Sequence, residues 1–258
     1  MIAQTLYITG GIVLSPVLPF MALQGKKIRA NMQDLPDAAP PYEGEVGDSG
    51  HRLRILGLGE STIAGVGVEQ MEQSITAHIA RHLQRQLDCP FQWEVIGRSG
   101  YTAQKVSEEL VPLIPSQDYD LIVIGLGGND TFLLTSPRQW QKSIQELITC
   151  IRRQGHKSPI LFINVPPVHE FLVFPWHFKL VLGRLVRLHS YVLKQVAYRA
   201  DQVHYMQDKI HLSDMMQRVP YPTQPTDYFS DGVHPSELTY RLWAQQIAEF
   251  ILERQLIG

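Results

Sequence analysis

The sequence predicts a three-layer α/β/α fold, in which helices cover both faces of a central parallel β-sheet. Short apolar runs alternate along the chain with longer segments whose apolar residues recur at helical spacing. Strand–helix alternation of this kind implies parallel strands that are covered on both sides. The 258 residues are 44% hydrophobic and 19% charged, so the chain can form one sizeable core.

Five segments have the length and apolar character of strands. Residues 52–58 are predicted to form a buried strand that ends at a glycine-rich turn. Residues 120–126 form a near-continuous apolar run, which is typical of a central parallel strand. The other predicted strands are residues 91–96, 159–165 and 202–206.

The segments that follow the strands predict five helices. In residues 71–87, isoleucines and leucines recur at four-residue steps along one face. Residues 137–153 begin with a proline, which suits the first turn of a helix. The other predicted helices are residues 102–114, 178–199 and 236–256.

The N-terminus is an apolar arm, residues 1–30. Its first 25 residues contain no Asp, Glu, Lys or Arg, and Lys26, Lys27 and Arg29 follow directly. A helix of that length could span a bilayer, but two glycines and two prolines interrupt it. Membrane contact through residues 1–25 and packing against the domain or a second subunit both remain open. The basic residues that follow the charge-free run favour a cytoplasmic location over secretion.

A Pro-, Gly- and acid-rich stretch, residues 31–51, is expected to be an irregular connector. The folded domain is expected to span residues 52–258.

Charge and cysteine content exclude several classes of protein. The net charge is −2 and no basic block stands out, which argues against a nucleic-acid partner. Cys89 and Cys150 are far apart and have no metal-binding spacing. His78 and His82 are four residues apart and could form half a metal site, but an obvious third ligand is lacking. No metal and no other cofactor is therefore expected, and the oligomeric state stays open.

Ser61 lies where the first predicted strand ends, within a turn that has glycines on both sides. Glycines let the backbone turn sharply and let a substrate approach. A serine at a strand-to-helix turn presents its hydroxyl at the carboxyl edge of the sheet, a common place for a nucleophile. The alternative is an ordinary turn or helix-cap serine.

Asp231 and His234 lie three residues apart in a loop before the last helix. A histidine that takes a proton from serine needs a carboxylate to hold its tautomer. This loop can supply both groups and bring His234 to Ser61. The alternative is a turn-capping aspartate beside a surface histidine.

Two further turns at the same sheet edge could stabilise a developing oxyanion. Asn129 can offer a side-chain amide, while Gly100 and Ser61 can offer backbone N–H groups. The alternatives are an Asx turn at Asn129 and an ordinary positive-φ turn at Gly100.

The four turns, in this order, resemble the SGNH (GDSL-type) esterase and lipase family. The resemblance rests on Gly59-Glu60-Ser61 with Gly65, then Gly100, then Gly127-Gly128-Asn129-Asp130, then Asp231-Gly232-Val233-His234-Pro235. It implies a flavodoxin-like fold, a nucleophile at Ser61, catalytic Asp231 and His234, and oxyanion donors at Ser61, Gly100 and Asn129. The chain looks most similar to the bacterial lysophospholipase/thioesterase I branch. One departure is Glu60, where the family usually has aspartate.

The implied function is hydrolysis of carboxylic esters or thioesters through an acyl-enzyme, without a cofactor. An aromatic cluster containing Phe174, Trp176 and Phe178 is expected to pack in the core or to shelter a lipid-like or medium-chain acyl group. A carbohydrate O-acetylesterase is the alternative enzyme. A phosphate- or nucleotide-binding domain is a further alternative, although no G-x-G-x-x-G or G-K-[ST] pattern is present.

Overall fold

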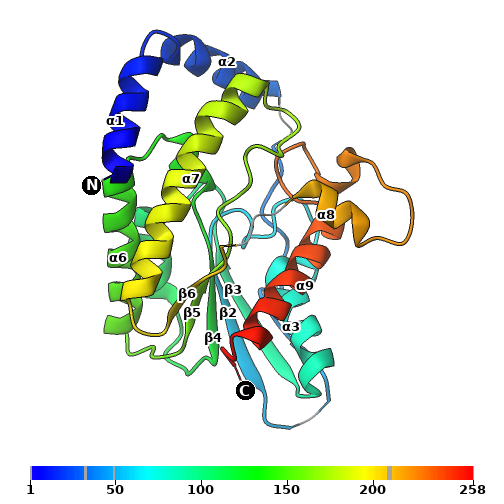
Figure 1. Ribbon diagram of the computed structural model, residues 1–258. Helices are drawn as coiled ribbons and strands as arrows, with labels where there is room; N and C mark the ends of the chain where they lie inside the picture. The colour runs from blue at the N-terminus through cyan, green and yellow to red at the C-terminus, as the bar shows by residue number, and fades with distance from the viewer. Residues whose placement is uncertain (1, 32–33, 49, 208–210, 258) are drawn as a thin grey trace.

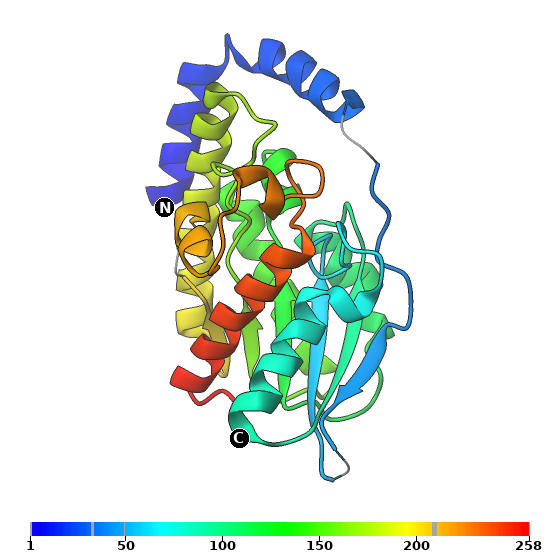
Figure 2. The ribbon, with the colours of Figure 1, turned by 90° about the vertical axis from the view of Figure 1, so that its right-hand side faces the viewer.

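The computed structural model describes residues 2–31, 34–48, 50–207 and 211–257. It contains one six-stranded sheet in the order β1-β3-β2-β4-β5-β6, with helices on both faces (Figures 1 and 2). The sheet consists of β1 (Glu43–Val46), β2 (Leu53–Gly59), β3 (Phe91–Gly97), β4 (Leu121–Gly125), β5 (Ile160–Phe162) and β6 (Val203–Tyr205).

The five strands from β2 to β6 are parallel, as predicted. Numbered among themselves, they lie in the flavodoxin-like order 2-1-3-4-5. The predicted three-layer α/β/α fold is therefore confirmed.

Alternate residues along each strand contact different helix layers. On one face, Ile55 and Val123 pack with α3 (Ile75–Leu87) and α9 (Glu237–Glu253). On the other face, Leu56 and Ile122 pack with α6 (Pro137–Arg153) and α7 (Trp176–Arg199). Both strand faces are thus removed from water, which explains the near-continuous apolar runs in the sequence.

The segment 31–51, expected to be irregular, contains an edge strand. β1 pairs antiparallel with β3, and Gly44 lies opposite Trp93. A methyl group at Gly44 would lie 2.5 Å from the Trp93 ring, so glycine is required there. Ala38, 2% exposed, donates its N–H to Ala64 O (2.9 Å) and ties the segment to the turn after β2. The sheet therefore begins before residue 52.

Residues 102–114 form three short helical pieces rather than one regular helix. α4 (Ala103–Lys105) leads into a π-helical turn, Val106–Leu110, and a 3₁₀ turn, Val111–Leu113. Pro112 in the last turn has no N–H to donate, and its ring opposes a regular α-helix. Residues 71–73 are also a separate 3₁₀ turn, and Ser74 caps α3 by accepting the Ala77 N–H.

The N-terminal arm forms two helices, α1 (Ile2–Leu14) and α2 (Leu18–Asn31). Figure 1 shows α1 beside α6 and α7, and α2 crossing the end of α7. Tyr7 donates its hydroxyl to Leu134 O (2.7 Å), and Gln4 Oε1 accepts the Arg138 N–H (3.1 Å). No single helix among the described residues is long and apolar enough to cross a membrane. Ile2–Leu14 and Pro19–Ile28 qualify only as a pair, bent by 92°.

Candidate active site

Three neighbouring strands end in glycine at the carboxyl edge of the sheet. Gly59 of β2 is paired with Gly97 of β3 and with Gly125 of β4. A methyl group at Gly59 would lie 2.1 Å from Gly125 O, and one at Gly97 would lie 2.7 Å from Ala64 N. Only glycines allow the turn after β2 to pack this closely on the strand ends. These glycines therefore position Ser61.

Ser61 begins a helical turn at this edge. Ile63 and Ala64 donate their N–H groups to Glu60 O, each at 2.9 Å, and Val66 donates to Ser61 O (3.0 Å). The Tyr240 hydroxyl, on α9, donates to Val66 O (2.8 Å) and anchors the end of the turn. Within the described residues, the Ser61 N–H has no acceptor, so it is free to bind an oxyanion.

Asp231 and His234 form a compact pair. His234 Nδ1 lies 2.8 Å from Asp231 Oδ2, while Asp231 Oδ1 accepts the N–H groups of Val233 (2.9 Å) and His234 (2.7 Å). The Asp231 side chain is 1% exposed. Burial alone would raise its pKa, but the hydrogen bonds from His234 and Val233 outweigh burial and lower it. Asp231 is thus an ionised acceptor that fixes the His234 ring.

The loop that carries His234 lies directly against the segment that follows Ser61. Ser230 Oγ donates to Gly67 O (2.8 Å), and a methyl group at Gly67 would lie 2.3 Å from Pro235 O. Ser61 and His234 both line one cavity of about 960 Å³. In the described part of the chain they share no hydrogen bond. Such bonds are often long before substrate binds.

Asn129 lines the same cavity, but its side chain already has partners. Its amide nitrogen donates to Glu60 Oε2 (2.5 Å) and to Tyr101 O (3.1 Å). The amide has only two hydrogens, and both are already donated. To bind an oxyanion, it must therefore share the hydrogen bonded to Tyr101 O or break that hydrogen bond. The structure therefore brings Asn129 to the site without presenting a free donor.

Glu60 is the functional residue whose role sequence reasoning missed. It is 1% exposed, and its two oxygens accept three N–H groups, those of Gly128 (2.7 Å), Asn129 (3.0 Å) and the Asn129 amide. Burial raises its pKa to about 7, although these hydrogen bonds act in the opposite direction. The only sequence signal was glutamate where the resemblance leads one to expect aspartate.

Gly100 lines the cavity and adopts φ = +81°. A methyl group there would have no atom within 4 Å, so the backbone conformation and not space favours glycine. Within the described residues its N–H has no acceptor. The N–H groups of Ser61 and Gly100 therefore form a pair of unpartnered donors at this edge.

Part of the cavity wall is aromatic. Phe174 and Phe178 line it, and their rings stack at 5.7 Å between centroids. Trp176 does not belong to this wall, contrary to the prediction. It is 75% exposed because it begins α7 and points to solvent.

Further cavity residues come from a part of the chain that sequence patterns did not connect with the site. α2 contributes Met21, Gly25 and Ile28, although it lies more than 30 residues before Ser61. Nothing in the apolar arm indicated this position. The arm is nevertheless part of the cavity wall.

A cluster of two histidines and one carboxylate adjoins the cavity. Glu170 lines the cavity, and its Oε1 lies 3.5 Å from His169 Nε2 and 3.4 Å from His211 Nδ1. The three ligand atoms lie within 4.8 Å of one another, a spacing that could hold a metal ion. His169 and Glu170 are adjacent in the sequence, but His211 follows 41 residues later, so no metal-binding motif signals the cluster.

Two other features lie apart from the site. His78 and His82, considered above as half a metal site, face α9, where His82 Nε2 lies 3.3 Å from Arg241 O. Burial lowers the pKa of His78 to about 4.

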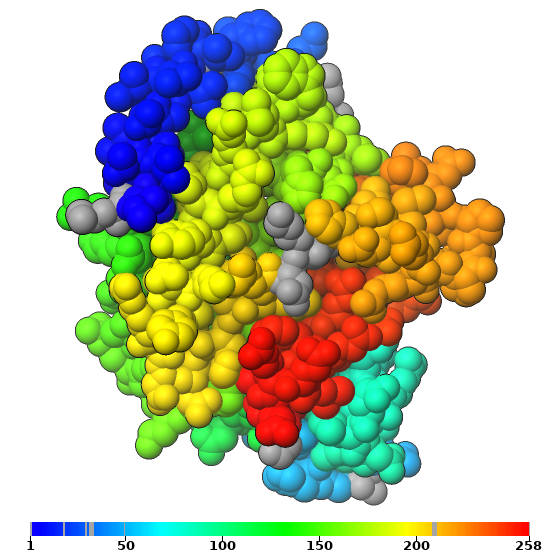
Figure 3. All heavy atoms as spheres, viewed as in Figure 1, coloured from blue at the N-terminus to red at the C-terminus, as the bar shows by residue number. Residues whose placement is uncertain are grey.

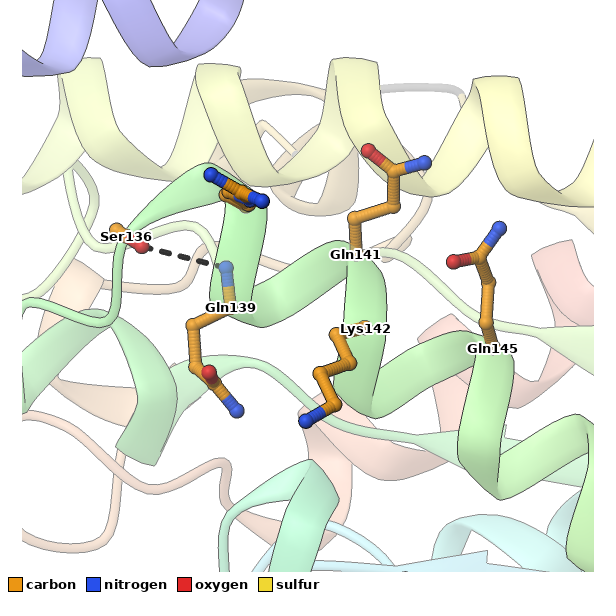
Figure 4. Close-up of a pocket in the computed structure, with 6 residues that line it drawn as sticks. Ser136, Gln139, Gln141, Lys142 and Gln145 are labelled. Atoms are coloured by element: carbon orange, nitrogen blue, oxygen red, sulfur yellow. Dashed lines mark hydrogen bonds between the residues drawn. The ribbon is translucent and has the colours of Figure 1, made fainter.

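A polar hollow over α6 is lined by Ser136, Gln139 and Lys142 among others and shares no residue with the cavity (Figure 4).

Comparison with known proteins decides the family. The sequence model of the GDSL-like lipase/acylhydrolase family matches residues 58–242. The chain belongs to this family. It is an SGNH enzyme that hydrolyses esters, as the sequence predicted. The comparison with curated proteins gives no match.

Solved structures similar to this GDSL-family chain share its fold at low identity. TesA is 19% identical, with a TM-score of 0.58, and the match covers 79% of this chain and 99% of TesA. A family 3 carbohydrate esterase from Clostridium thermocellum is 19% identical, with a TM-score of 0.59 and coverage of 81% and 100%. The lipase Lip_vut3 from a goat rumen metagenome is 19% identical, with a TM-score of 0.55 and coverage of 76% and 96%.

Proposed function

We propose that this enzyme is a serine esterase that forms an acyl-enzyme on Ser61 and prefers lipid-like or medium-chain acyl substrates. The observation that carries the proposal is the single cavity, which joins Ser61 and His234 to the aromatic wall of Phe174 and Phe178. A cavity lined by both reactive groups and apolar side chains suits an ester with a chain of several methylenes.

The reaction divides into two acyl transfers. Ser61 Oγ attacks the ester carbonyl carbon while His234 Nε2 takes the serine proton, and Asp231 stabilises the imidazolium through Nδ1–H. The tetrahedral intermediate expels the alcohol or thiol, which takes the proton from His234. Water then attacks the acyl-enzyme with His234 again as base, and the carboxylic acid and free Ser61 are released.

The oxyanion is held first by the backbone N–H groups of Ser61 and Gly100, because neither has another acceptor within the described chain. The Asn129 amide is the proposed third donor. It would join when the oxyanion forms, by sharing the hydrogen that now bonds to Tyr101 O. Glu60 keeps the other hydrogen and so orients the amide.

A lysophospholipase or thioesterase activity is the favoured form of this function. The sequence resemblance to the lysophospholipase/thioesterase I branch supports it, together with the apolar part of the cavity wall. A carbohydrate O-acetylesterase is the second candidate, supported by the likeness to the Clostridium thermocellum carbohydrate esterase. The two differ in the length of acyl chain that the cavity must hold.

A chain-length series distinguishes the two candidates. We expect kcat/KM for p-nitrophenyl esters to rise from acetyl toward decanoyl, because each buried methylene contributes about 0.8 kcal/mol, close to fourfold. Phe174→Ala should flatten this rise. Trp176→Ala is the matched control, because Trp176 is exposed and outside the cavity, and it should leave the series unchanged.

A steady fall in kcat/KM beyond acetyl would reject the acyl preference and favour the O-acetylesterase. Equal effects of Phe174→Ala and Trp176→Ala would show that the aromatic wall does not select the chain.

A further inference from the structure

Helix α1 is apolar on most sides, and although Ala3 is buried, most of its large apolar side chains point outward. Surface helices of a globular protein usually bury the apolar face and expose the polar one. In α1, Gln4 and Tyr7 point to the protein and are hydrogen-bonded to it. The opposite face carries large apolar side chains that are between 51% and 70% exposed: Ile2, Leu6, Ile8, Ile12 and Val13.

The exposed apolar surface continues along α2 and past the start of α7. Val17 precedes α2, and Phe20 and Leu23 on it are 64% and 69% exposed. Trp176 lies close by, since the neighbouring His177 Nε2 is 2.8 Å from Gln24 Oε1 of α2. Figure 3 shows α1 and α2 as one ridge over the surface. A patch of this extent marks a contact with a membrane or a protein.

Charge favours a lipid surface over a protein. Residues 1–33 contain no Asp or Glu, and Lys26 and Lys27 on α2 are exposed. Basic residues beside an apolar face are attracted to anionic lipid. The 13 residues of α1 extend about 20 Å, less than the hydrocarbon thickness of about 30 Å. α1 is therefore too short to span the bilayer and suits a position in its plane.

The same helix α2 also closes the cavity. Met21, Gly25 and Ile28 line it, and a methyl group at Gly25 would contact Phe178 at 3.5 Å. One side of α2 thus faces the acyl wall while the other, with Phe20 and Leu23, is exposed. An acyl chain could pass from a bilayer beside α2 into the cavity.

We propose that α1 and α2 dock the enzyme onto anionic lipid, in the plane of the surface, and deliver lipid acyl chains to the cavity. The docking is independent of catalysis, whereas the delivery rests on the proposed function. The occupant of the exposed face is thus a lipid surface, not a second copy of the chain.

Vesicle flotation of the full-length protein tests the docking. We expect binding to phosphatidylcholine vesicles that contain phosphatidylglycerol, and weaker binding without it. The double variant Ile12→Gln/Phe20→Gln should bind at least tenfold more weakly, and Lys27→Glu should lose the preference for phosphatidylglycerol. Tyr198→Gln is the matched control, because Tyr198 is 88% exposed on α7 outside the arm, and it should bind normally.

All variants change side chains outside the cavity, so each should hydrolyse a soluble short-chain ester as fast as wild type does. This activity serves as the control for correct folding. Wild type that fails to float, or a double variant that floats equally well, would overturn the docking. A wild-type dimer in light scattering that Ile12→Gln/Phe20→Gln converts to monomer would assign the face to a second copy and reject lipid. Normal flotation without a medium-chain preference would instead contradict the proposed function.

Discussion

Glu60 connects the turn that bears Ser61 with the turn that bears Asn129. Its carboxyl group accepts the N–H groups of Gly128 and Asn129 at the start of α5 (Gly128–Phe132) as well as the Asn129 amide. A methyl group at Gly128 would lie 3.0 Å from Glu60 Oε1, so a glycine lets the carboxylate approach. Glu60 thus holds the Ser61 turn and the Asn129 turn together at the cavity.

The buried Glu60 should make stability depend on pH. Burial raises its pKa from 4.5 to about 7, so the folded state holds the proton more tightly than the unfolded state. Its contribution to stability is therefore lost as pH rises from 4.5 through 7, by about 3 kcal/mol. Denaturant unfolding at pH 5 and pH 8 measures the effect. Between these pH values, the free energy of unfolding should fall further in wild type than in Glu60→Gln.

Asp130 is present in both proteins and also titrates in this range, since burial raises its pKa to about 6. The same pH dependence in wild type and Glu60→Gln would mean that Glu60 remains ionised throughout.

At this scale the sequence predicted the grouping of Ser61, Asp231 and His234 at one sheet edge. The prediction was possible because each lies next to a glycine turn whose position follows from strand order. The sequence could not show that the Asn129 amide already has two acceptors. One of them is the backbone carbonyl of Tyr101, and every residue has a backbone carbonyl, so no residue type marks it. Trp176 was misplaced because an aromatic cluster in sequence does not reveal which rings point inward.

At the scale of elements, the strands and long helices were predictable because their periodicity is imposed by burial on both sheet faces. β1 was missed because it is short, carries two glutamates and one glycine, and pairs antiparallel at the edge. The π-helical turn at Val106–Leu110 was missed because apolar spacing alone does not distinguish it from an α-helix.

The glycine strand ends should be needed for activity. Gly97→Ala would bring a methyl group to 2.7 Å from Ala64 N and displace the turn that begins at Ser61. We expect a loss of about 1–3 kcal/mol in stability, as for overpacked cores, and a clear fall in kcat. Chemical denaturation and steady-state kinetics measure both.

Gly183→Ala on α7 is the matched control. The nearest atom to its methyl group would be His169 Cβ at 3.9 Å, an ordinary contact. Alanine also favours the helix by up to about 1 kcal/mol, so stability should hold or rise. Equal stability and kcat for Gly97→Ala and wild type would contradict the tight packing at the strand ends.

At the scale of the whole molecule, the cavity draws on two regions of the chain. The family match covers residues 58–242 and contains the turns of Ser61, Asn129 and His234, whereas α2 lies outside it and contributes apolar residues to the cavity wall. The sequence left two alternatives for the arm: membrane contact through residues 1–25, or packing on the domain or on a second subunit. In the structure one side of the arm packs on α6 and α7 while the other stays exposed and apolar. Periodicity could not reveal this, because α1 is apolar on most sides and its sequence does not mark which side faces the protein.

The central claim is that Ser61 is an activated nucleophile. The most direct measurement is covalent labelling by a fluorophosphonate, followed by mass spectrometry of the labelled peptide. We expect one label per chain, located on Ser61, and no label in Ser61→Ala, whose circular dichroism and thermal unfolding should match wild type. Labelling retained in folded Ser61→Ala, or a wild type that does not react, would contradict the account.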